Sequence, residues 1–219
     1  MTTPRMPALP AVVLAFALAL AGCSSSAPTP EWQMNAKSAL DRATAAWLEG
    51  NSRVADAEFA RARAEAARTG RVELVARIEL TRCAARVAAL DLAACTGFES
   101  LRADAPAAER AYADYLAGRV DGAGIALLPA QHRAVAAGGQ AAVAAVEDPL
   151  ARLVAAGVMF ARGEASPATV ELAVDTASAQ GWRRALLAWL GVQARLADQA
   201  GDAQAAERVR RRIALVEGR

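Results

Sequence analysis

Two cysteines, Cys83 and Cys95, have a residue type and a spacing that could support a disulfide, a metal site or redox chemistry. Cys83 falls in a segment expected to be helical, residues 72–91, and Cys95 lies beyond the break at Asp91. Each is six residues from Ala89, so in a helical hairpin the two would lie at the same height. A disulfide is expected in an oxidising compartment, and two buried free thiols are the alternative. Metal and redox roles are not favoured, because the sequence has no Cys-x-x-Cys pair.

The other candidates for catalysis are the single histidine and the carboxylates. His132 comes near the start of a helical turn with no strained nucleophile motif and no second imidazole, so it is predicted to lie at the surface or to cap a helix. Glu73 precedes Arg77 by four residues, which predicts a helix-stabilising pair. No spacing selects two carboxylates that could flank a glycosidic bond. The sequence therefore predicts no catalytic, cofactor-binding or metal site, and a protein that is not an enzyme.

Arginines cluster near the C-terminus, on a segment whose other side is apolar. One interpretation is the solvated outer face of a capping helix, with cations favoured near the helix C-terminus. The other is contact with anionic lipid headgroups or with an acidic partner. The residues of this cluster are Arg208, Arg210, Arg211 and Arg212.

The elements that must position these residues are predicted to be helices. Of the 219 residues, 61 are alanine, the best helix former, and only three are the β-branched isoleucine. Ser166-Pro167 and Asp148-Pro149 predict helix starts, with a side-chain cap followed by proline. Gly70, Gly181 and Gly201 suit the left-handed residue that ends a helix. The predicted class is all-α.

The N-terminus carries a separate signal. Arg5 precedes an uncharged apolar run, residues 8–21, which is shorter than the roughly 20 residues that cross a bilayer. The run ends in Leu20-Ala21-Gly22-Cys23, which resembles the lipobox of bacterial lipoproteins. The resemblance implies a signal peptide over residues 1–22, fatty acylation of Cys23 and a lipidated tether over residues 23–30. The alternative is an ordinary secretory signal with an incidental cysteine. Ser24 after the cysteine implies the outer membrane of a Gram-negative cell.

Residues 31–219 contain a second resemblance. Gly50-Asn51 is followed by Ala55, Phe59 and Ala62, and Gly201-Asp202 repeats part of this spacing. The pattern resembles a degenerate tetratricopeptide repeat. It implies an irregular array of antiparallel helical hairpins, in the manner of a right-handed solenoid, with a concave groove.

Together these features predict a protein that binds a partner and catalyses no reaction. The formal net charge of +2 argues against nucleic-acid binding, which needs a strongly basic face. The two resemblances imply an outer-membrane lipoprotein that faces the periplasm and acts as a non-enzymatic scaffold or adaptor for an envelope protein assembly. Its only expected attachment is the covalent lipid, with no other cofactor. The alternative is a lipoprotein that binds or hydrolyses the peptidoglycan cell wall.

Overall fold

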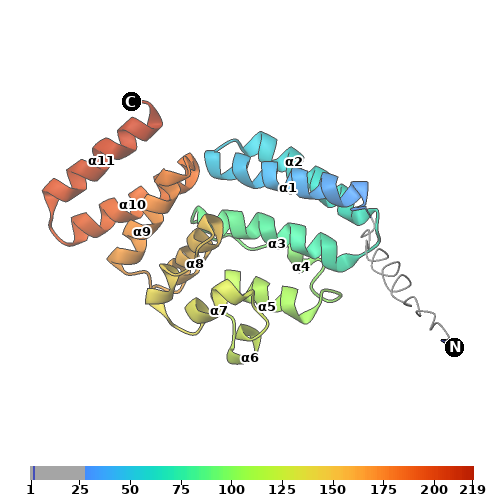
Figure 1. Cartoon of the computed structure of the whole chain (residues 1–219). Helices are drawn as coiled ribbons and strands as arrows, with labels where there is room; N and C mark the ends of the chain where they lie inside the picture. The colour runs from blue at the N-terminus through green and yellow to red at the C-terminus, as the bar shows by residue number, and fades with distance from the viewer. Residues whose placement is uncertain (1, 3–27) are drawn as a thin grey trace. The chain divides into compact units, whose positions relative to one another are not determined.

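Alanine-rich segments form the helices of this chain in the computed structural model, which describes residues 2 and 28–219 (Figure 1). The predicted cleavage site, the predicted acylation site Cys23 and most of the predicted tether lie outside the described residues. Within the described part every regular element is helical and no strand is present, so the predicted all-α class is confirmed.

Residues Glu31–Arg219 form one structural unit. Its helices are α1 (Glu31–Glu49), α2 (Ser52–Ala67), α3 (Val72–Ala88), α4 (Thr96–Glu99), α5 (Ala107–Leu116), α6 (Gly122–Ile125), α7 (Ala130–Ala136), the 3-10 helix η2 (Gln140–Val143), α8 (Pro149–Ala161), α9 (Pro167–Ala179), α10 (Arg183–Gln199) and α11 (Ala203–Glu217).

Local sequence explains where several of these helices begin and end. The Asp148 side chain accepts a hydrogen bond from the backbone N–H of Ala151 at the start of α8, and Ser166 caps α9 in the same way. Both helices have proline at the first position, as predicted. Gly70 and Gly181, which follow α2 and α9, have φ angles of 67° and 68°. These angles are the left-handed values that were predicted for helix ends.

Helix α3 occupies the middle of the unit. It packs against α1 and α2 on one side and against α5 and α8 on the other (Figure 1). Helices at the C-terminal end pack mostly in sequence order, α8 on α9, α9 on α10 and α10 on α11. In addition α1 packs against α10, so the first and the last long hairpins are in contact.

Small residues allow the closest of these approaches. Gly157 of α8 faces the end of α3, where a Cβ atom at position 157 would lie 2.4 Å from the carbonyl oxygen of Val87. Large aromatic side chains fill the remaining spaces: Phe98 and Trp189 are fully buried. The Trp189 indole N–H donates to the carbonyl of Ala88 at 3.0 Å, which ties α10 to the end of α3.

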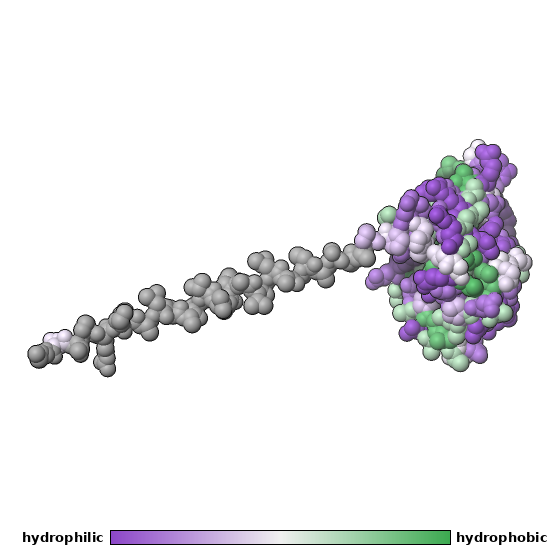
Figure 2. Space-filling model, turned by 90° about the vertical axis from the view of Figure 1, so that its right-hand side faces the viewer, coloured by the Kyte–Doolittle hydropathy of each residue, from purple (hydrophilic) through white to green (hydrophobic). Residues whose placement is uncertain are grey.

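One end of the unit shows how apolar and hydrophilic side chains are distributed over its surface. Figure 2 views it from the end at which α1 and α3 begin, and shows small apolar patches separated by hydrophilic side chains. Among the helices that the structure describes, none has both the length and the apolar character needed to cross a membrane.

Candidate functional site

Cys83 and Cys95 form a disulfide, with their Cα atoms 5.8 Å apart. Cys83 lies on α3, but Cys95 does not lie on an opposing helix as a hairpin would require. It ends the irregular segment 91–95, which returns along α3 and leads into the short α4. The structure thus joins the two predicted cysteines through a loop that folds back on one helix.

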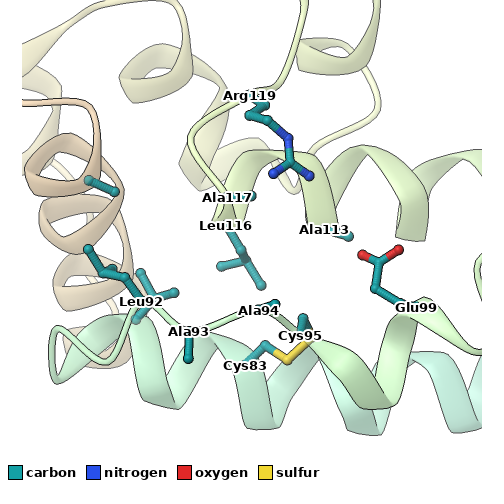
Figure 3. A pocket seen from close by; sticks show the side chains of 12 residues that line it. Cys83, Leu92, Ala93, Ala94, Cys95, Glu99, Ala113, Leu116, Ala117 and Arg119 are labelled. Atoms are coloured by element: carbon teal, nitrogen blue, oxygen red, sulfur yellow. A yellow bond between two sulfur atoms is a disulfide. The ribbon is translucent and has the colours of Figure 1, made fainter.

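The disulfide borders a hollow of about 250 Å³ (Figure 3). Leu116 of α5 forms part of the opposite wall, and the charged side chains of Arg119 and Glu99 border the hollow. Hydrogen bonds from Arg102 hold the pKa of Glu99 below its usual range. Because Glu99 is already paired with Arg102, this hollow offers no uncompensated carboxylate for acid–base chemistry.

His132 is buried, so the prediction of a surface or capping histidine was wrong. Its side chain is only 2% exposed, and its Nδ1 lies 3.2 Å from the hydroxyl of Tyr115. The rings of Tyr112 and Tyr115 pack against the imidazole, with centroids 5.7 and 4.9 Å away. Pro129, and not His132, occupies the cap position of α7. Burial lowers the pKa of His132 to about 4 and raises that of Tyr115.

Three hollows lie along the unit and draw most of their lining from α1, α3, α5 and α7. The largest, of about 560 Å³, lies between α3, α5 and the start of α7. A second, of about 270 Å³, lies between α1 and α3, and Arg77 borders both. The third, of about 150 Å³, continues from the largest at Thr81 and Tyr112 toward His132. We call this surface the α1–α3–α5–α7 face; its main lining residues are Trp32, Ala36, Leu40, Leu74, Arg77, Leu80, Thr81, Ala108, Glu109, Tyr112, Leu127, Leu128, Pro129 and Arg133.

One ion pair crosses this face. Arg77 Nε donates to Glu109 Oε1 at 2.7 Å, and Glu109 is only 6% exposed, so the buried carboxylate is compensated. The predicted pairing of Glu73 with Arg77 was therefore wrong. Glu73 accepts instead from Arg71 at 2.6 Å, because the Arg77 side chain reaches across to α5.

Arg133 differs from Arg77 in having no carboxylate partner within 4 Å in residues 28–219. Its Nε donates to the backbone carbonyl of Leu128 at 2.8 Å, and the side chain is otherwise exposed at the edge of the largest hollow. Arg71, which also borders the second hollow, is paired with Glu73. Of the three guanidinium groups at the edge of the face, only that of Arg133 is therefore uncompensated within the described part of the chain.

The predicted arginine cluster lies on the outer side of α11, where all four side chains are exposed. Arg210 pairs with Asp198 of α10 at 2.7 Å, and Glu207 lies within 4 Å of both Arg210 and Arg211. Arg208 and Arg212 form no ion pair within the described part of the chain. The opposite side of the helix is anchored by the buried Val209.

The α1–α3–α5–α7 face was not recognised from the sequence, although part of it was visible there. Tyr112 and Tyr115, three residues apart, predict an aromatic stripe on one side of a helix, and this stripe is what packs against His132. The sequence did not indicate which helices pack together to form this face, because irregular segments separate α3, α5 and α7.

Within residues 2 and 28–219, no group of three or more histidine, cysteine, aspartate and glutamate side chains is arranged to hold a metal ion. No family model, no curated protein and no solved structure matches the chain.

Proposed function

We propose that this protein is a lipid-anchored adaptor of the outer membrane, which binds a segment of an envelope protein on its α1–α3–α5–α7 face and performs no chemical step. The observation that carries the proposal is the run of three hollows along that face. Their linings are mainly apolar, and the compensated ion pair Arg77–Glu109 does not resemble a catalytic pair.

The arrangement of the lining supports an array of the tetratricopeptide type. In a stack of helical hairpins, every other helix contributes to one face, and such faces bind extended partners. The two larger hollows are lined chiefly by α1, α3, α5 and α7, and the third also takes Leu150, Ala151 and Val154 from α8. The hairpin α1–α2 also carries the residues of the repeat-like spacing, and Ala55, Phe59 and Ala62 are buried in it.

The location in the proposal rests on two further observations. Disulfides persist in oxidising compartments such as the bacterial periplasm, and the bond between Cys83 and Cys95 supports a protein exported from the cytosol. The lipobox-like Leu20-Ala21-Gly22-Cys23 favours an anchor in the membrane. Two or three acyl chains on one residue give stable attachment.

Photo-crosslinking in cells tests the proposal. A photoreactive amino acid replaces Leu127, which is 46% exposed at the edge of the largest hollow, and, as a matched control, Leu215 on α11, which is 78% exposed. We expect a discrete adduct with an envelope protein from position 127 and none from position 215. Adducts of equal yield from both positions, or none from position 127, would contradict the proposal.

The cell-wall alternative is checked with the purified protein. Incubation with isolated sacculi should release no muropeptides and show no saturable binding. Release of muropeptides would instead indicate a cell-wall hydrolase, and saturable binding would indicate a cell-wall-binding protein.

A further inference from the structure

The largest hollow of the face has an apolar lining and two charged edges. We call it the Leu127 hollow; it is lined by Leu80, Ala108, Tyr112, Leu127, Leu128 and Pro129, with Thr81, Arg77, Glu109 and Arg133 at its edges. Its volume of about 560 Å³ lies in the range of sites that take up several large side chains or a small ligand. Burying an apolar side chain there is favourable, because it removes apolar surface from water.

The two arginines at the edge of the hollow are not equivalent. Arg77 is committed to the buried Glu109, so a further carboxylate near Arg77 would also meet the negative charge of Glu109. Arg133 is held only through its Nε, by the carbonyl of Leu128, and its two terminal nitrogens face no carboxylate in the described part of the chain. A guanidinium fixed in this way can bind a carboxylate through two parallel hydrogen bonds.

On the basis of the proposed function, we infer that the Leu127 hollow recognises a segment of the partner protein in which a large apolar residue stands next to an acidic residue. The apolar side chain fills the hollow, and the carboxylate pairs with Arg133. A peptide suits the site better than a free acyl chain, because Leu127 at the edge is half exposed and a single chain of methylenes would leave much of this edge in water.

A display library of random heptapeptides, selected on the purified full-length protein in detergent, tests the inference. We expect the enriched peptides to place leucine, isoleucine, phenylalanine or methionine beside aspartate or glutamate. A synthetic peptide of the most enriched sequence should bind the Arg133→Gln variant about tenfold more weakly, as expected for loss of a charge-assisted hydrogen bond.

Two matched controls separate recognition from folding. Arg195→Gln removes an exposed arginine of α10 that forms no ion pair in the described part of the chain, and should leave the peptide affinity unchanged. Leu127→Ala should weaken binding several-fold, whereas Leu215→Ala on α11 should not.

Several outcomes would overturn the inference. These are a library with no enrichment, enriched peptides without acidic residues, and an affinity that is the same for wild type and Arg133→Gln. A sedimentation coefficient showing Arg133-dependent self-association would assign the hollow to a second copy of the chain. Native mass spectrometry showing a lipid lost on Arg133→Gln would assign it to a lipid. If the crosslink from position 127 to an envelope protein persists in any of these cases, the proposed adaptor function is retained. Only the inferred apolar and acidic character of the partner segment is then rejected.

Discussion

At the scale of single residues, the burial of His132 beside Tyr115 changes its titration near neutral pH and lowers its pKa to about 4. In the unfolded chain a histidine titrates near 6.5. Between these values the unfolded state binds more protons than the folded state, so this residue makes folding stability fall as the pH is lowered. The contribution of the neutral His132 to the free energy of unfolding is fully present above about pH 6.5. It is lost progressively as the pH falls to about 4.

Urea unfolding at two pH values measures this effect. Between pH 7 and pH 4.5, we expect His132 to account for a loss of about 2 kcal/mol in the free energy of unfolding. In His132→Gln this part of the pH dependence should be absent, while the part due to carboxylates remains. As a check that does not depend on the variant folding, the imidazole NMR signals of the wild type should not titrate between pH 6 and pH 7. A midpoint near 6.5 would contradict the expectation.

The disulfide is the second residue-scale feature with a measurable consequence. Cys83 and Cys95 are 12 positions apart, and closing a loop of this size stabilises a fold by about 3 kcal/mol in the chain-entropy treatment. We expect the double variant with alanine at both positions to lose about this amount in chemical denaturation. A reducing agent should lower the wild type to the level of the variant and leave the variant unchanged. Equal stability of the oxidised wild type and the variant would contradict the expectation.

At the scale of elements, the crossing of α3 and α8 depends on one glycine. A Cβ at position 157 would come within 2.4 Å of the Val87 carbonyl oxygen, and backbone cannot give way as a flexible side chain can. Gly191, in the middle of α10, has no heavy atom within 4 Å of the corresponding position. The two helical glycines therefore form a matched pair for the same substitution.

We expect Gly157→Ala to lower the free energy of unfolding by about 2 kcal/mol, as in overpacked cores. Gly191→Ala should raise it by up to about 1 kcal/mol, because alanine is the better helix former. Thermal or chemical denaturation of both variants decides the matter. Stabilisation by both substitutions would show that α3 and α8 do not approach as closely as the structure places them.

The elements also show how far the sequence allowed prediction. The caps at Asp148 and Ser166 and the glycines that end helices depend on neighbours within a few residues, and these were predicted correctly. The burial of His132 and the reach of Arg77 to Glu109 depend on which helices meet in space. Alanine-rich helices give few signals for this choice, because their small side chains fit many partners equally well. The α1–α3–α5–α7 face combines several helices and was therefore not predictable as a whole, although the spacing of Tyr112 and Tyr115 indicated one part of it.

At the scale of the whole molecule, the proposed anchor gives the fourth prediction. Cys23→Ser should leave the protein without acyl chains and move it from the membrane fraction to the soluble fraction. Mass spectrometry of the wild type should show a mature chain that begins at residue 23 and carries fatty acids. The Cys83→Ala, Cys95→Ala variant serves as the control and should stay with the membrane. An unmodified thiol at position 23 in the wild type would remove the basis for the proposed location.

The contacts of α1 with α10 and of α3 with α8 have a consequence for how the chain tolerates truncation. In an open stack, each hairpin touches only its neighbours, so hairpins can be duplicated or deleted at either end with little loss. Here the indole N–H of Trp189 in α10 donates a hydrogen bond to the carbonyl of Ala88 in α3, 101 positions earlier. Because Trp189 is fully buried, removal of the last hairpins would expose the middle of the core to solvent. A protein built in this way should tolerate the loss of its last hairpins less well than an open stack does.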